Sequence, residues 1–272
     1  LVKDDIEKES LPERVEACRI NTVKSVYHLM TSKIWLDNCR KFFIKFKRQQ
    51  QFYIQTWHGF ALKQIEKDAQ EKLSPDYVKL AKRDSENTDV IISCSRFMTS
   101  LYQNSFWYNG NILEIGAPRN DVLLIKDNNL KKKVYDYLGI DEGKGIVLYA
   151  PTFRVDKKMS AYSLDYKRLK NVSGRRFGKD FVIVTRLHPN IANQSSELDN
   201  NSDIINGSFY PDMQELMLAS DIIITDYSSV MFDFSLMYKP CFQFATDISE
   251  YKNDRGFYFR LDELPFSVSS DN

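Results

Sequence analysis

Short apolar runs alternate with polar, helix-like stretches along the chain from about residue 110 onward. The runs lie at 112–115, 146–150, 181–187, 203–205, 221–225 and 241–245. Several lack the alternation of a half-exposed strand and are typical of strands that are covered on both faces in a parallel sheet. Helix candidates lie between them at 128–138, 211–219 and 230–238. The pattern therefore predicts an α/β fold.

The first half of the chain carries fewer strand signals. Strand-like runs lie at 51–57, 89–95 and 112–115, with a less regular one at 25–30. Because a complete Rossmann-like half contains more strands, we expect its opening strands to be missing from this numbering. A polar stretch at 120–129 marks the expected boundary between a partial N-terminal domain at 1–125 and a C-terminal domain at 126–272.

Composition excludes several classes of protein. The 272 residues include 38 Lys and Arg against 37 Asp and Glu, so there is no basic excess of the kind that indicates a nucleic-acid partner. The four cysteines are far apart, without a CxxC pair or a neighbouring histidine at ligand spacing. They predict reduced thiols in the core of a cytosolic protein, and neither a zinc site nor a disulfide framework. No apolar run approaches the ~18 residues of a membrane span, and the charged N-terminus is unlike a signal peptide.

Polar residues follow several runs at the point where a strand is expected to end. In an open α/β sheet, ligands bind beyond the carboxyl ends of the strands. The segments in that position are His58-Gly59, 116–121, 151–154, 186–189 and 226–229. These segments are therefore the candidates for a binding or catalytic site.

Two serines in the last segment precede a predicted helix. Ser228 and Ser229 would meet the free N–H groups of the helix start, where a phosphate binds favourably. The alternative is that one serine only caps the helix. Arg154 and Arg186 suit phosphate through their planar guanidinium groups, or form ordinary ion pairs.

Two of the three histidines follow strand-like runs. His58 and His188 come from different halves, and either is suited to act as a general acid or base. The alternative for each is a structural histidine in the core. We interpret His28 as structural.

A basic and aromatic stretch covers residues 40–48. Its cations, interleaved with apolar residues, are Arg40, Lys41, Lys45, Lys47 and Arg48. Such a stretch fits an anionic membrane surface, and it fits equally an edge strand or loop whose lysines guard its exposed side.

Several familiar motifs are absent from the sequence. There is no GxxxxGK[ST], no GxGxxG after a strand, no HExxH and no GxSxG. This argues against P-loop ATPases, common dinucleotide enzymes, zincins and typical α/β-hydrolases.

Six segments together resemble the CDP-glycerol glycerophosphotransferases, bacterial enzymes that build wall teichoic acids and related capsular polymers. The matching segments are 55–59 (QTWHG), 116–121 (GAPRND), 150–154 (APTFR), 186–189 (RLHP), 225–233 (TDYSSVMFD) and 247–259. They occur in the family's order, and the resemblance as a whole covers about residues 25–266.

The resemblance implies a GT-B fold, with two Rossmann-like halves facing across a cleft. It implies metal-independent transfer of glycerol phosphate from CDP-glycerol to a hydroxyl of a polyprenyl-diphosphate-linked saccharide or polyol-phosphate acceptor, with release of CMP and no cofactor. The enzyme would lie peripherally on the cytoplasmic face of the membrane. Phe60 departs from the small polar residue of many members and is more similar to primase-type enzymes.

The resemblance also implies roles for single residues. His58 is expected to be the general base on the acceptor hydroxyl, and His188 to assist at the phosphates or the leaving group. Arg154, Ser228 and Ser229 are expected to hold the donor diphosphate, and Asp233 to belong to the donor pocket. Arg186 joins these donor-binding candidates because of its place at a predicted strand, and not through the resemblance. Further candidates are Gly59, Arg119, Asp121 and Asp226, of which Arg119 and Asp121 are alternatively structural.

Three alternatives remain open from the sequence. A CDP-ribitol or other polyol-phosphate transferase shares the motifs. A GT-B glycosyltransferase or sugar-nucleotide epimerase shares the fold but breaks a bond at the anomeric carbon. A non-enzymatic, membrane-docking subunit is the third.

Overall fold

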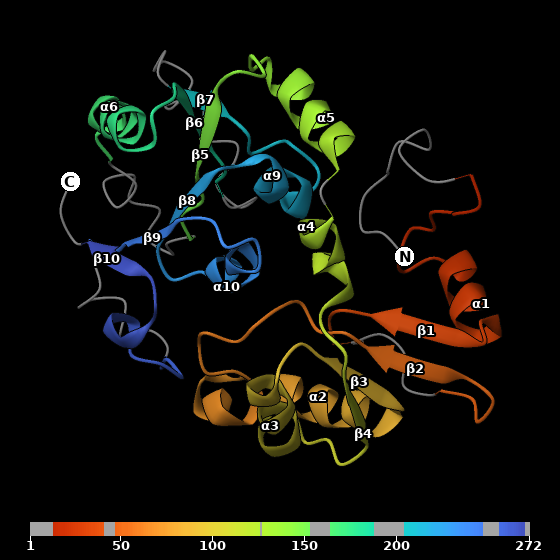
Figure 1. The fold of residues 1–272 in the computed structure, drawn as a ribbon. Coiled ribbons are helices and arrows are strands. Elements are labelled where there is room, and N and C mark those ends of the chain that lie inside the picture. The colour runs from red at the N-terminus through yellow and green to blue at the C-terminus, as the bar shows by residue number, and fades with distance from the viewer. Residues whose placement is uncertain are drawn as a thin grey trace. The chain divides into compact units, whose positions relative to one another are not determined.

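The computed structural model describes residues 13–40, 47–125, 127–152, 164–187, 204–246 and 256–269. By their contacts the residues divide into two compact units, whose ribbons are drawn in Figure 1. Unit 1 has the bounds Leu1–His58 and Ile65–Gly116, and unit 2 has the bounds Gly59–Gln64 and Ala117–Asn272. The short segment 59–64 therefore belongs to unit 2, although residues of unit 1 precede and follow it.

The described part of unit 1 forms a four-stranded parallel sheet in the order β1-β2-β3-β4. Its elements are α1 (Val23–Thr31), β1 (Ile34–Asp37), β2 (Phe52–Gln55), η2 (Glu66–Lys72), α2 (Pro75–Asn87), β3 (Val90–Ser93), α3 (Arg96–Ser105) and β4 (Asn111–Glu114). The predicted strands at 51–57, 89–95 and 112–115 are confirmed as β2, β3 and β4.

The expectation of a strand at 25–30 is wrong, because these residues lie in helix α1. Thr22 and Ser25 form a capping box that starts the helix: the backbone N–H of each donates to the hydroxyl of the other at 3.1 Å. Leu29 then packs with Trp35 and Tyr53 in a small apolar cluster. Strand β1, which contains Trp35, was not predicted from the sequence.

The described part of unit 2 forms a six-stranded parallel sheet in the order β10-β9-β8-β5-β6-β7. Its strands are β5 (Gly145–Tyr149), β6 (Phe181–Thr185), β7 (Ile204–Asn206), β8 (Ile222–Thr225), β9 (Cys241–Phe244) and β10 (Ser267–Ser269). Its helices are η3 (Pro118–Asn120), α4 (Asp121–Leu124), α5 (Asn128–Leu138), α6 (Tyr166–Phe177), α9 (Met213–Ala219), α10 (Val230–Ser235) and η5 (Leu261–Glu263). The predicted α/β class with parallel sheets is confirmed.

Helices cover both faces of the sheet in unit 2. Val134 of α5, Leu216 of α9 and Phe234 of α10 pack on one face. Tyr166 of α6 packs on the other face, against a cluster that includes Val147, and Figure 1 shows α6 on the side opposite α5 and α9. Each fully buried side chain of this size contributes about 1.5–3 kcal/mol. The carboxyl ends of β5, β6 and β8 are therefore held at the edge of a well-packed core.

Candidate active site

His58 lies just after β2 in unit 1, with an exposed side chain. Its Nδ1 lies 2.9 Å from the carbonyl oxygen of Asn38, and its ring centroid lies 4.2 Å from that of Trp57. A carbonyl oxygen only accepts hydrogen bonds, so Nδ1 carries the hydrogen in this contact. In the neutral imidazole the basic nitrogen is then Nε2. This is the tautomer that a base acting through Nε2 requires.

In unit 2, the carboxyl ends of β5 and β8 are joined through Asp226. This buried carboxylate accepts hydrogen bonds at Oδ1 from the backbone N–H of Thr152 at 2.8 Å and of Tyr227 at 2.6 Å. The Gln243 amide donates to its backbone carbonyl at 3.2 Å. Asp226 therefore shapes the two loops that follow these strands.

Ser228 and Ser229 are half-buried between β8 and α10. The Ser228 hydroxyl accepts a bond from the backbone N–H of Val230 at 3.3 Å, while Ser229 holds the N-cap position without a capping bond from its side chain. The capping alternative thus applies to the hydroxyl of Ser228. Both hydroxyls lie at the predicted place, at the carboxyl end of a central strand.

Arg186 follows β6 at the same edge of the sheet, since Thr185 of β6 pairs with Tyr149 of β5. Its NH1 donates to the carbonyl oxygen of Tyr210 at 2.5 Å and reaches that of Gly207 at 3.5 Å. Burial lowers the pKa of the Arg186 guanidinium below its ordinary value. One end of this guanidinium therefore secures the connection between β7 and α9.

Gly59, Arg119 and Asp233 come from three of the six matching segments and meet within unit 2. Arg119 NH2 donates to Asp233 Oδ2 at 2.5 Å, and the Asn120 amide donates to Asp233 Oδ1 at 2.6 Å. A Cβ on Gly59 would lie 2.4 Å from Arg119 NH2. Asp233 therefore holds η3 through both residues. Asp121 is exposed at the start of α4.

The expectation that Arg40 lies on a membrane-facing surface is wrong, because its side chain is 1% exposed and paired with Glu66 and Asp84. Arg48 is exposed, and Lys47 is half-buried in an ion pair with Asp89. Four further candidates lie outside the described residues, namely Lys41, Lys45, Arg154 and His188.

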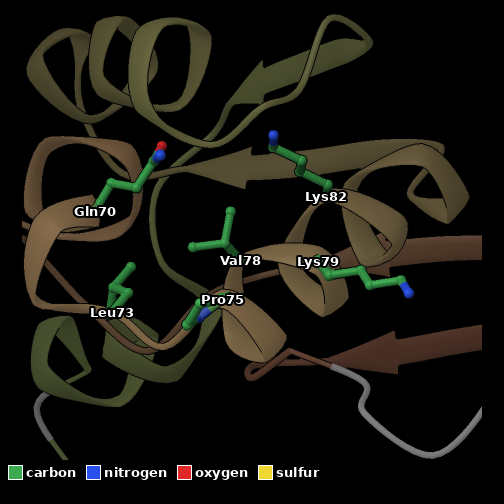
Figure 2. A pocket seen from close by; sticks show the side chains of 6 residues that line it. All are labelled: Gln70, Leu73, Pro75, Val78, Lys79 and Lys82. Carbon is green, nitrogen blue, oxygen red and sulfur yellow. The ribbon is translucent and has the colours of Figure 1, made fainter.

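Unit 1 also contains a hollow of about 430 Å³ (Figure 2). Its lining comes from the end of η2 and from α2, and consists of Gln70, Leu73, Pro75, Val78, Lys79 and Lys82. None of the predicted site residues that the structure describes lines this hollow.

Within the described ranges, no group of three or more His, Cys, Asp or Glu side chains is placed to hold a metal ion. A search of the same residues finds no helix with the length and apolarity needed to cross a bilayer.

Sequence reasoning missed two contributors to this geometry. Asn38 directly follows β1. Because β1 was not predicted, nothing in the sequence indicated that the Asn38 carbonyl lies at the end of a strand. Asn120 lies inside a matching segment, and its neighbours Arg119 and Asp121 drew attention in its place. The motif itself was the signal that would have found it.

Comparison with known proteins shows what the chain is similar to. The model of a family described as CDP-Glycerol:Poly(glycerophosphate) glycerophosphotransferase matches residues 1–271. The teichoic acid poly(glycerol phosphate) polymerase of Staphylococcus epidermidis is 34% identical over 97% of this chain and 38% of its own length. The teichoic acid glycerol-phosphate transferase of Staphylococcus aureus is 34% identical over 86% of this chain and 63% of its own length.

Among solved structures, a variant of the wall teichoic acid polymerase TagF in a structure with CDPG is similar with a TM-score of 0.82 and 33% identity. The match covers 96% of this chain and 66% of that one. The chain thus spans 38% and 63% of the lengths of the two curated relatives above.

Proposed function

Because this chain belongs to the CDP-glycerol:poly(glycerophosphate) glycerophosphotransferase family, we propose that it transfers glycerol phosphate from CDP-glycerol to an acceptor hydroxyl, releasing CMP. Two relatives named for glycerol phosphate and a TagF structure with CDPG support this donor over CDP-ribitol. The acceptor in this proposal is a polyprenyl-diphosphate-linked saccharide or a growing polyol-phosphate chain.

The observation that carries the chemistry is the contact between His58 Nδ1 and the Asn38 carbonyl, at 2.9 Å. It leaves Nε2 as the basic nitrogen, which takes the proton of the acceptor hydroxyl. The acceptor oxygen then attacks the phosphorus that carries glycerol. The bond from that phosphorus to the oxygen of CMP breaks, and CMP leaves with the bonding electron pair.

Charge on the transferred phosphoryl group needs hydrogen-bond donors and cations to stabilise it. We assign this role to Ser228, Ser229 and Arg186 at the carboxyl edge of the sheet in unit 2, and to Arg154. His188 assists at the phosphates or at the leaving CMP. Asp226 and Asp233 act by shaping and holding the loops of this donor site, and Gly59 and Arg119 belong to the same arrangement.

The proposal includes the GT-B architecture expected from the sequence, in which residues 1–125 serve the acceptor, apart from Gly59 and Arg119, and residues 126–272 serve the donor. It also places the enzyme peripherally at the cytoplasmic face of the membrane. Among the cations of the 40–48 stretch that the structure describes, Arg48 is the one that is exposed and available for this contact. Replacing Lys41 and Lys45 by Gln should then reduce binding to anionic vesicles in a salt-sensitive way. Binding that persists unchanged would remove this stretch from the membrane contact.

The direct test incubates the protein with CDP-glycerol, and separately with CDP-ribitol, in the presence of lipid-linked saccharides, followed by mass spectrometry of the products. CMP together with an acceptor enlarged by glycerol phosphate supports the proposal. In a further incubation with a sugar nucleotide in place of the CDP-polyol, release of a nucleoside diphosphate would support the glycosyltransferase alternative.

The role of His58 is tested by the variant His58→Ala. Loss of a positioned base should lower kcat by about 10²- to 10⁴-fold, with little change in the KM for CDP-glycerol. His28→Ala is a matched control, because His28 lies in α1 and has no place in the proposed chemistry. An unaltered kcat in His58→Ala would overturn the assignment of the base.

A further inference from the structure

Among the left-handed residues of unit 1, which also include Asn21 and Trp107, Trp57 and Glu66 share a φ of 53°. They bracket residues 58–65, so His58 directly follows the first of them. Residues with side chains rarely adopt such angles, which persist only where surrounding contacts enforce them, and they cluster at functional sites. The contacts that hold Trp57 therefore bear on the direction of His58.

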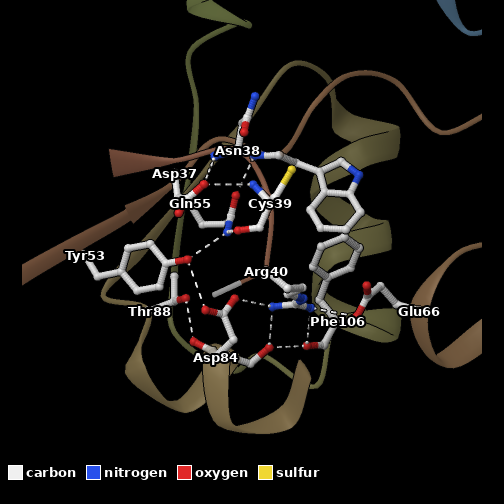
Figure 3. A network of polar contacts seen from close by, with 12 residues as sticks. Asp37, Asn38, Cys39, Arg40, Tyr53, Gln55, Glu66, Asp84, Thr88 and Phe106 are labelled. Atoms are coloured by element: carbon white, nitrogen blue, oxygen red, sulfur yellow. Dashed lines mark hydrogen bonds and ion pairs between the residues drawn. The ribbon is translucent and has the colours of Figure 1, made fainter. Parts of the chain in front are cut away.

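One buried side chain, that of Arg40, contacts both Trp57 and Glu66. Its Cζ lies 5.7 Å from the centroid of the Trp57 ring, and its NH2 donates to Glu66 Oε2 at 2.8 Å. Its NH1 donates to Asp84 Oδ2 at 3.2 Å, and Figure 3 shows the guanidinium between the two carboxylates. Burial would lower the pKa of Arg40, but the carboxylates of Glu66 and Asp84 raise it above its ordinary value.

A chain of hydrogen bonds links Asp84 to the backbone of Trp57. The Tyr53 hydroxyl donates to Asp84 Oδ1 at 3.1 Å, and Gln55 Nε2 donates to that hydroxyl at 3.0 Å (Figure 3). The other end of the Gln55 amide, Oε1, accepts from the backbone N–H of Trp57 at 2.9 Å. Arg40 is therefore connected to Trp57 twice, through the ring and through Asp84.

The loop that precedes Arg40 presents the partner of His58. Asp37 Oδ1 accepts from the backbone N–H groups of Asn38 at 2.9 Å and Cys39 at 3.2 Å, which fixes the turn after β1. The carbonyl of Asn38 then meets His58 Nδ1. Because Arg40 ends this turn, its anchoring holds the turn against the core. Trp57 and the Asn38 carbonyl, two groups that contact the His58 ring, are thus both linked to Arg40.

We propose that Arg40 is a positioning residue for His58: its buried contacts hold Trp57 and the 37–39 turn so that Nδ1 meets the Asn38 carbonyl and Nε2 remains the basic nitrogen. The inference deepens the proposed function, since it concerns the residue assigned there as the base. Arg40 itself does not touch the substrate. It acts inside unit 1.

The test combines nitrogen-15 NMR of the imidazole tautomers with steady-state kinetics. The chain has only three histidines, so His58→Gln identifies the signals of His58. The test variants are Arg40→Met and Arg40→Lys, where lysine keeps the charge but lacks the planar fork and the stacking surface. Gln55→Met is a third, which removes the acceptor for the Trp57 N–H and leaves every Arg40 ion pair in place.

We expect the Nδ1–H tautomer of His58 to lose population in all three variants. We expect kcat to fall about tenfold or more, since small misplacements of a reacting group are costly, with the KM for CDP-glycerol nearly unchanged. Both the tautomer population and kcat should change less in Arg40→Lys than in Arg40→Met. Tyr108→Phe, which removes a buried hydroxyl elsewhere in unit 1, should lower stability without moving the His58 signals.

The outcomes separate this inference from the proposed function. If Arg40→Met does not fold, Arg40→Lys and Gln55→Met carry the test. An unchanged His58 tautomer in folded forms of these two variants would overturn the positioning role. A changed tautomer supports it. If that change leaves kcat unaltered and His58→Ala also leaves it unaltered, the positioning role stands and the assignment of His58 as base falls.

Discussion

Gly59 illustrates at the level of one residue why a motif position tolerates no side chain. Its φ of 130° lies where residues with a Cβ are strained, and a Cβ there would approach Arg119 NH2 to 2.4 Å. Arg119 has limited freedom to move aside, because its guanidinium is bonded to Asp233. Glycine at position 59 thus follows from both the backbone and its neighbour.

Gly59→Ala should lower the free energy of unfolding by about 2–4 kcal/mol, from backbone strain and from displacement of Arg119 off Asp233. Gly139→Ala is the matched control, because Gly139 has a φ of 65° but no atom within 4 Å of an added Cβ. Gly139→Ala should lower the free energy of unfolding by only about 1–2 kcal/mol. Urea unfolding measures both. Equal losses would show that the approach of Arg119 imposes nothing beyond the backbone strain.

At the level of elements, α10 organises three segments of unit 2 that are distant in the sequence. Its Asp233 binds η3, and the centroid of its Phe232 ring lies 4.1 Å from the centroid of the Phe60 ring in the 59–64 segment. The same segment pairs with the chain at 256–258: Gln64 N–H donates to the Gly256 carbonyl at 2.8 Å. Helix α10 therefore anchors residues 59–64 to unit 2 immediately after His58.

Asp233→Asn should lower the free energy of unfolding by about 2 kcal/mol, because it weakens charge-assisted hydrogen bonds to Arg119 and Asn120. A double-mutant cycle with Arg119→Gln should give a coupling energy of about 1 kcal/mol or more between the two side chains. Additive losses would contradict the pairing. A raised KM for CDP-glycerol without loss of stability would instead favour the direct donor contact that the family resemblance implies for Asp233.

At the level of the whole molecule, buried tyrosines in both units make the free energy of unfolding depend on pH in the alkaline range. Burial raises the pKa of Tyr135 and Tyr166 in unit 2 and of Tyr108 in unit 1 to about 12 each. Unfolded tyrosine has a pKa of about 10. Between these values the unfolded chain binds fewer protons than the folded one, so stability is full below pH ~10 and falls as pH rises toward ~12.

Tyr166→Phe should reduce this alkaline loss by on the order of 2 kcal/mol at pH ~12, since phenylalanine has no proton to release. Tyr238→Phe, at a 98% exposed position, is the control. Burial also lowers the pKa of Lys239 to about 8, which makes stability rise with pH between ~8 and ~10.5, mostly below the range in which the tyrosines reduce it. Urea unfolding across the pH range measures the slopes. Parallel curves for Tyr166→Phe and the unmodified protein would contradict the assignment.

Several strands were readable from the sequence because their surroundings are simple. Strands β5 and β8 are buried along their whole length, so each appears as an uninterrupted apolar run. Strand β1 has only Trp35 fully buried among four residues, and α1 takes its identity from the Thr22 and Ser25 capping box. Short elements with one or two buried side chains carry too little periodic signal to separate a strand from a helix.

The sequence by itself determined the α/β class, the family and the residues of the motifs, because buried parallel strands and clustered polar residues at their ends leave local patterns. Only the tertiary structure decided what Arg40 does. In the sequence it is a cation beside phenylalanines, typical of a surface, whereas its carboxylate partners Glu66 and Asp84 lie far along the chain. Burying a charge is costly unless such partners surround it, and that pairing arises only when distant segments pack together.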